Sequence, residues 1–144
     1  MMRQSRPIGR LCVLNRMTYL FVYGTLRRGY GHPAQAQLVR QGRWLGAGWL
    51  RGRLYDLGEY PGFVSTPDSW TWVRGDVYEL APAGTLLAAL DAYEESGLAP
   101  GAEYVRRRYL VRMEKENWRT AWVYVYNWPV PVHRLISSGD YLAQ

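Results

Sequence analysis

The chain has 144 residues, which suits one domain with its own hydrophobic core. Its 48% hydrophobic residues include no uninterrupted apolar run of about 18, so a membrane-spanning helix is excluded and we expect a cytoplasmic protein without a membrane partner. The single cysteine excludes an internal disulfide, and the net charge of +6 raises the question of nucleic-acid binding.

Residues 1–16 account for most of that charge. They contain four arginines and no acidic residue, whereas residues 17–144 hold fourteen basic and twelve acidic side chains. Since the segment also lacks a hydrophobic pattern, we expect a flexible basic leader followed by one domain over residues 17–144. The nearly balanced domain makes nucleic acid an unexpected partner.

The first patterned segment, 19–23, is apolar and aromatic, which predicts a core strand. It ends at Gly24, where a glycine permits a tight turn or a close approach of the backbone. Thr25, Leu26 and two arginines follow. Such a loop can present backbone N–H groups to a carboxylate or phosphate. The alternative is an ordinary turn between a strand and a loop.

The remaining elements alternate between helix and strand. In chain order we predict a helix from Pro33 to Gly42, a bent or bulged strand 44–57, a turn at 60–62, a strand 70–80 with a bulge at Gly75, a helix 84–95, and strands 103–114 and 119–128. This order predicts an α+β domain with a mixed, strongly curved sheet that can close into a barrel.

The helix 84–95 carries the sharper chemical signal. Asp91, Glu94 and Glu95 all lie in its last turn, where the helix dipole disfavours negative charge. Glu94 follows Leu90 by four residues and so extends the apolar face, whereas Glu95 points elsewhere. Violations of local rules concentrate at functional sites, although a frayed, solvated helix end is the simpler alternative.

Other chemical patterns are weak. His32 and His133 have no Asp or Ser partner at a recognisable spacing, and no metal-ligand pattern such as H-E-x-x-H occurs, so we expect no metal. We interpret His133 as a surface residue. The run 106–108 of three arginines reads as a solvated strand face, with Arg107 on the side opposite the other two.

Two short segments together resemble the gamma-glutamylcyclotransferase-like (AIG2-like) family. They are Val-Tyr-Gly-Thr-Leu at 22–26 and Leu-Asp-Ala-Tyr-Glu at 90–94, supported by 52–58, 60–62, 73–78 and 138–140. The resemblance spans about residues 17–142. It implies a barrel of about six strands flanked by helices, and neither a metal nor a cofactor.

The resemblance also implies a site and a reaction. The loop of Tyr23, Gly24, Thr25 and Leu26 would bind the α-carboxyl end of a γ-glutamyl substrate through backbone N–H groups. Glu94 matches the family's catalytic glutamate. The implied reaction converts the γ-glutamyl group to 5-oxoproline and releases an amine or amino acid. Members of the family differ in substrate, so the particular γ-glutamyl compound does not carry over.

Three functions remain open at this point. The first is a cyclotransferase-like enzyme, the second a small-molecule binder that uses the same pocket without catalysis, and the third a module that binds nucleic acid or a protein partner through the leader and the aromatics. Only the enzyme needs a carboxylate at Glu94, and the charge distribution argues against the third. The chain is expected to be a monomer or a homodimer.

Overall fold

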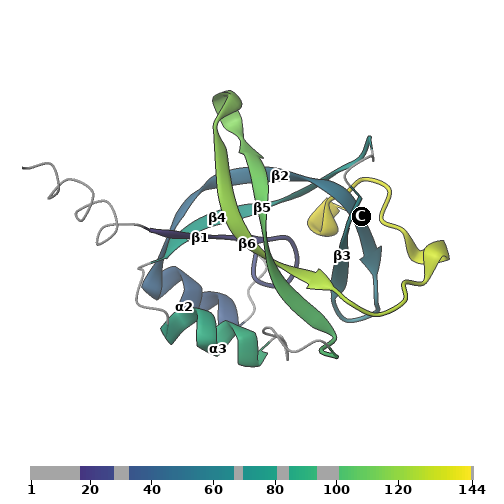
Figure 1. The fold of residues 1–144 in the computed structure, drawn as a ribbon, viewed down its shortest axis with the longest axis horizontal. Helices are drawn as coiled ribbons and strands as arrows, with labels where there is room; N and C mark the ends of the chain where they lie inside the picture. Colours follow the sequence, from purple (N-terminus) through teal and green to yellow (C-terminus); the bar gives the residue numbers. More distant parts are fainter. Residues whose placement is uncertain (1–16, 28–32, 67–69, 81–84, 94–100, 144) are drawn as a thin grey trace, which may run out of the picture.

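The computed structural model describes residues 17–27, 33–66, 70–80, 85–93 and 101–143 (Figure 1). The leader predicted at 1–16 lies outside this part. The strands are β1 (Thr18–Val22), β2 (Gly42–Asp56), β3 (Pro61–Ser65), β4 (Trp72–Leu80), β5 (Tyr104–Met113) and β6 (Trp118–Tyr126). The helices are α2 (Pro33–Gln41) and α3 (Thr85–Tyr93), with short 3₁₀ turns η1 (Glu114–Glu116), η2 (Val132–Arg134) and η3 (Tyr141–Ala143).

The six strands form one strongly curved sheet that closes on itself. Five of them follow the order β1-β4-β2-β3-β6, and β6 returns to β1 as a parallel neighbour with Leu20 opposite Trp122. The sixth, β5, pairs along its length with β6 and also reaches β2, where Gly48 lies opposite Met113. The predicted α+β barrel flanked by helices is therefore confirmed (Figure 1).

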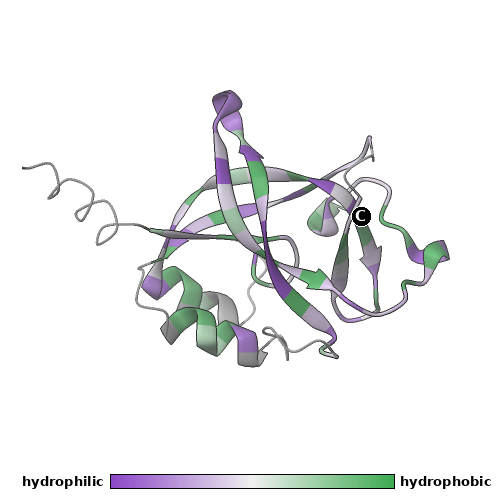
Figure 2. Ribbon diagram, in the orientation of Figure 1, coloured by the Kyte–Doolittle hydropathy of each residue, from purple (hydrophilic) through white to green (hydrophobic). Residues whose placement is uncertain are grey.

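The core has two layers, because several strands bury both faces. In β1, Phe21 packs inside the barrel, while Leu20 and Val22 pack in the layer beneath the helices. The helices α2 and α3 lie side by side on that flank and contribute Leu38 and Leu90 (Figure 1). Hydrophobic residues accordingly occupy the helices and strands, whereas the tip of the β5–β6 hairpin is hydrophilic (Figure 2).

The turn predicted at 60–62 is displaced in the structure. The reversal lies at residues 57–60, where the Leu57 N–H donates to the Tyr60 carbonyl at 2.9 Å. Pro61 and Gly62 instead open β3, a strand that the sequence pattern did not reveal. Proline is tolerated there because the first residue of a strand need not donate to the ladder.

The bulge predicted at Gly75 is also wrong. The register between β2 and β4 is regular at that glycine, and it shifts instead between Trp44 and Gly46. Gly75 is required for a different reason: a Cβ at this position would lie 2.3 Å from the carbonyl oxygen of Val22. Because Gly75 has no side chain, the backbone of β1 at Val22 can lie close to β4.

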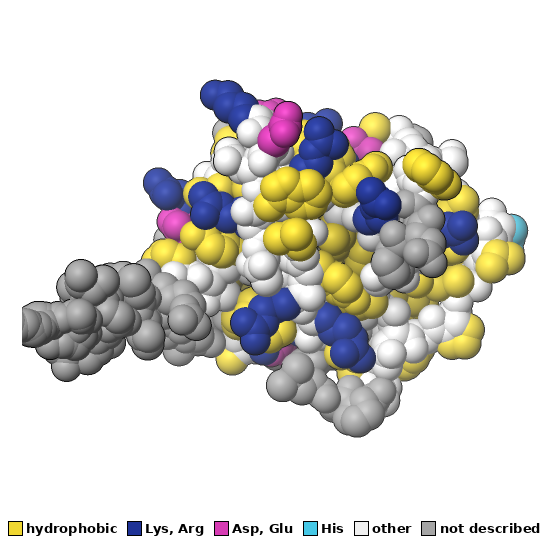
Figure 3. All heavy atoms as spheres, turned by 45° about the horizontal axis from the view of Figure 1, so that its top comes forward, with side chains coloured by type: hydrophobic (Ala, Val, Ile, Leu, Met, Phe, Trp, Pro, Cys, Tyr) yellow, Lys and Arg dark blue, Asp and Glu magenta, His cyan; other side chains and the backbone are white. Residues whose placement is uncertain are grey.

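The outer surface carries its arginines singly among apolar side chains (Figure 3). The guanidinium groups of Arg106 and Arg108 lie 4.3 and 4.7 Å from the centre of the Trp122 ring, at cation–π distance.

His133 is exposed, as predicted. Among the described residues, no helix has the length and apolar character needed to cross a membrane.

Candidate active site

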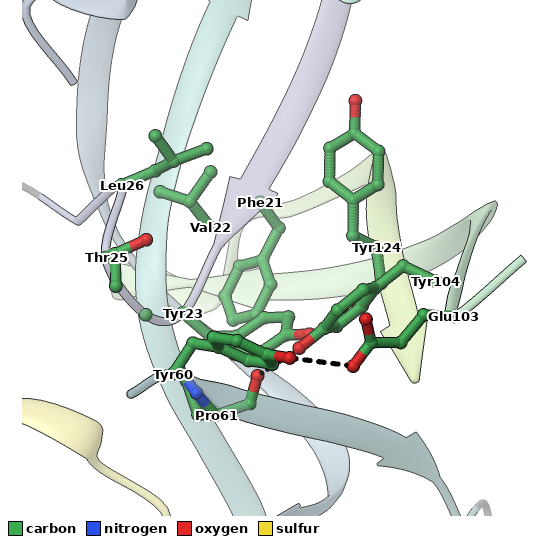
Figure 4. Close-up of a pocket in the computed structure, with 11 residues that line it drawn as sticks. Phe21, Val22, Tyr23, Thr25, Leu26, Tyr60, Pro61, Glu103, Tyr104 and Tyr124 are labelled. Carbon is green, nitrogen blue, oxygen red and sulfur yellow. Dashed lines mark hydrogen bonds between the residues drawn. The ribbon is translucent and has the colours of Figure 1, made fainter. Parts of the chain in front are cut away.

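A cavity of about 210 Å³ opens where β1 ends (Figure 4). It is lined by Phe21, Val22, Tyr23, Gly24, Thr25, Leu26, Tyr60, Pro61, Glu103, Tyr104 and Tyr124. Sites for drug-sized ligands usually measure about 300–1,000 Å³, so this cavity suits a smaller molecule. All four residues of the predicted binding loop, 23–26, line it.

The loop after β1 is held close to the start of β3. A Cβ on Gly24 would lie 2.6 Å from Cγ of Pro61, so the close approach anticipated for this glycine is present. The Arg27 N–H donates to the Gly24 carbonyl at 3.0 Å and closes the turn. Residues 24–26, whose turn is held by these contacts, therefore form one wall of the cavity.

Tyr23 joins three strands behind that wall. Its hydroxyl donates to the Tyr124 carbonyl at 2.6 Å and accepts the Phe63 N–H at 3.2 Å. Both bonds are buried, and the ring packs against Phe63 with a centroid distance of 5.8 Å. The side chain thus links β1 to β3 and β6 at the base of the cavity.

We expect Tyr23→Phe to destabilise the fold by about 2 kcal/mol, because it leaves a buried carbonyl and a buried N–H without this partner. For a domain of this size the melting temperature should fall by about 4–8 °C. Thermal unfolding measures the effect. Tyr141→Phe is the control, since the bond from that hydroxyl to the Glu59 carbonyl is exposed and 3.5 Å long, so its loss should change little.

Asp91, the acidic residue at the described end of α3, is paired, so the solvated helix end considered above is wrong for this residue. Asp91 accepts two hydrogen bonds from Arg106, at 2.8 and 3.1 Å, and one from the Tyr124 hydroxyl at 2.7 Å. The solvated face predicted for the arginine run is therefore wrong for Arg106, which is part-buried, and correct for Arg107 and Arg108. These bonds fix the helix beside a wall residue of the cavity.

The predicted catalytic residue, Glu94, lies outside the described residues, so its position stays a prediction. In the described part of α3, Leu90 is buried, as its place on the apolar face requires; Leu86 is also buried and Leu87 is partly buried. They pack in the same cluster as the wall residues Leu26 and Tyr104. The helix that precedes Glu94 thus lies directly against the cavity walls.

Comparisons with known proteins match nearly the whole described domain. The sequence profile of the family "Gamma-glutamyl cyclotransferase, AIG2-like" matches residues 20–143. The chain belongs to this family. A relative from Escherichia coli K12, named gamma-glutamylcyclotransferase family protein YtfP, is 36% identical over 130 residues, which cover 85% of this chain and 95% of the relative.

Solved structures agree with the AIG2-like assignment. The crystal structure of a mouse AIG2-like protein superposes with a TM-score of 0.70 at 24% identity, covering 87% of this chain and 88% of that one. Bacillus subtilis YkqA gives a TM-score of 0.66 at 25% identity, with 87% of this chain matching 39% of the longer protein. The shared fold is the barrel described above.

Segment 138–140, one of those that carry the AIG2-like resemblance, contacts the end of the binding loop through Asp140. Arg27, at the end of the loop, is buried and its Nη1 lies 2.5 Å from Oδ1 of Asp140. Asp76 of β4 lies 3.8 Å from the same guanidinium. Gly139 takes a φ of 72°, and a Cβ there would lie 2.1 Å from the Trp72 carbonyl oxygen. Sequence analysis gave Arg27 no role.

Sequence analysis also missed the far side of the cavity. Glu103 is the sole carboxylate among the described lining residues, and it accepts a hydrogen bond from the Tyr60 hydroxyl at 2.9 Å. The Tyr104 hydroxyl donates to the Pro61 carbonyl at 2.8 Å.

The described residues contain no group of three His, Cys, Asp or Glu side chains that could hold a metal ion.

Proposed function

We propose that this protein cyclises the γ-glutamyl group of a small molecule to 5-oxoproline and releases an amine or amino acid. The observation that supports it most is the cavity wall formed by residues 24–26, a turn directly at the end of a core strand. Backbone N–H groups in such a turn suit a carboxylate, and the α-carboxylate of a γ-glutamyl compound supplies one.

The reaction is intramolecular. The α-amine nitrogen forms a bond to the γ-carbonyl carbon, and the bond from that carbon to the leaving nitrogen breaks. Because both groups belong to one molecule, holding them in contact gives a high effective molarity, on the order of 10⁵ M or more in well-oriented cases. The fixed walls of the cavity would serve this positioning.

Glu94 is proposed as the proton carrier. The amine is protonated near neutral pH, so a base must remove a proton before attack, and the departing nitrogen must gain one. A carboxylate shielded from water has a raised pKa, which suits this exchange near neutrality. The nearby position of α3 supports the assignment, since Glu94 directly follows its described part.

The test is formation of 5-oxoproline. Purified protein is incubated with a panel of γ-glutamyl amines and γ-glutamyl amino acids, and 5-oxoproline is quantified by mass spectrometry. We expect time-dependent product from at least one compound and none from the α-glutamyl isomers. Tight binding without product would instead support the non-catalytic binder. If the protein neither binds any compound nor forms product, both assignments are refuted.

A further inference from the structure

The side of the cavity away from the binding loop is both aromatic and acidic. Tyr60 and Tyr104 line the cavity there with ring centroids 6.1 Å apart, and Tyr126, which is not a lining residue, continues the row 5.5 Å from Tyr104, each pair close to edge-on. The Glu103 carboxylate lies beside this row and accepts the Tyr60 hydroxyl. We name these four residues the tyrosine–glutamate rim.

The rim lies apart from the loop. In Figure 4 the Glu103 carboxylate is on the opposite side of the pocket from Thr25 and Leu26, and the rings of Tyr60 and Tyr104 lie between them. A γ-glutamyl compound has its α-carboxylate at one end and its leaving group at the other. With the first end on the loop, the leaving group extends along the tyrosines towards Glu103.

The rim favours positive charge. An ammonium group is attracted by a carboxylate and by the faces of aromatic rings, and the two effects act together when they share a site. The described lining residues include no basic side chain that would oppose this. Burial, and secondarily the charge of Glu103, raises the pKa of the Tyr126 phenol, so that tyrosine stays neutral and adds no negative charge of its own.

Fixed backbone contacts hold the rim in place. The Asn127 N–H donates to the Glu103 carbonyl at 2.7 Å, and the Tyr104 hydroxyl donates to Pro61. The Tyr60 hydroxyl uses only part of the acceptor capacity of the carboxylate, which has about four lone-pair sites. With respect to the described residues, Glu103 therefore keeps acceptor capacity for a ligand.

We infer that the tyrosine–glutamate rim selects γ-glutamyl compounds whose leaving group carries a positive charge, with Glu103 as the specificity-determining residue. The preferred substrate class is then γ-glutamyl conjugates of diamines, ahead of conjugates of uncharged amines, with conjugates of amino acids last because their carboxylate is repelled. The inference rests on the proposed cyclisation for its orientation of the substrate.

Three conjugates of equal length test it: γ-glutamyl-1,4-diaminobutane, γ-glutamyl-butylamine and γ-glutamyl-4-aminobutanoate. We expect kcat/KM to fall in that order, by about three- to tenfold for each step at low salt. Glu103→Gln should reduce both ratios towards one. Raising the salt concentration should weaken the preference of the unaltered protein, since exposed charges are screened.

The matched control is Glu59→Gln, which removes the same charge from an exposed neighbour that does not line the cavity. It should leave the order of the three conjugates unchanged. If Glu103→Gln lowers kcat/KM equally for all three, Glu103 contacts the common α-ammonium group and the inference is wrong. Activity without any charge preference overturns the inference while the proposed function stands.

Calorimetric binding of the same three conjugates separates the two proposals. If no conjugate yields 5-oxoproline, the cyclisation fails, and the dissociation constants then test the rim by themselves. The diamine conjugate should bind about three- to tenfold more tightly than the butylamine conjugate, and Glu103→Gln should abolish the difference. Equal dissociation constants for all three in the unaltered protein would overturn the inference.

Discussion

Glu94→Gln is expected to lower kcat for γ-glutamyl cyclisation by roughly 10²–10⁴-fold, the usual cost of removing a general base. The amide preserves the size of the side chain and its hydrogen-bonding capacity but cannot take up the proton of the attacking amine. Folding should survive, because the change is close to isosteric. Steady-state kinetics on the most active γ-glutamyl compound measure the loss, and thermal unfolding checks the fold.

Glu95→Gln provides the control for that result. The two glutamates are adjacent in sequence, and helical phase places the second away from the apolar face, so this variant should retain nearly full turnover. Equal activity of both variants and the unaltered protein would show that Glu94 is not the base. A large loss in Glu95→Gln alone would mean that the helical phase was assigned wrongly.

Arg27→Met is expected to destabilise the domain by about 3 kcal/mol, because removing one partner of a buried ion pair leaves the other charge uncompensated. The Arg27 side chain is only 6% exposed and contacts Asp76 and Asp140. The melting temperature should fall by about 6–12 °C. Since the Arg27 side chain ties the end of the binding loop to Asp140, KM for a γ-glutamyl substrate should rise as well.

Arg43→Met is the comparison for this change. It removes the same group from an ion pair with Glu79, but the Arg43 side chain is 72% exposed, so the pair is screened by solvent. Its loss should cost less than about 1 kcal/mol. If the two variants unfold at the same temperature, the buried ion pair does not hold the loop, and the proposed effect on KM loses its basis.

The sequence predicted most of the barrel because its strands follow clear local patterns. In β6, successive side chains point to opposite faces: Ala121 and Val123 face the interior of the barrel, while Tyr124 packs under the helices. The short strand β3 escaped notice because its first two residues, Pro61 and Gly62, are typical of turns. Its strand conformation comes from pairing with the preceding strand β2 and with β6, which is distant in sequence.

The candidate site was predicted only where its residues adjoin in sequence. The loop 23–26 lines the cavity as expected, and its glycine makes the close approach that its position suggested. Glu103 was missed because a carboxylate before a strand resembles any solvated strand end. Its partner, Tyr60, lies 43 residues earlier, and no local pattern reveals such a pair.

The interaction between Asp91 and Arg106 shows the same limit. The sequence placed Asp91 where the helix dipole disfavours a negative charge, but its compensating partner comes from a strand 15 residues further on. Strand alternation separated Arg107 from the other two arginines, but it could not show that Arg106 rather than Arg108 pairs with α3. Tertiary contact decides which charge in a run is paired.

Closure of the barrel between β1 and β6 has a consequence for how the protein is made. The pocket needs both strands, and the Tyr23 hydroxyl reaches the Tyr124 carbonyl 101 residues later. A growing chain on the ribosome therefore cannot assemble the cavity until β6 has emerged, when most of the domain has been synthesised. Contacts so distant in sequence form slowly, and until then the apolar face of β1 depends on the nascent helices or on chaperones for cover.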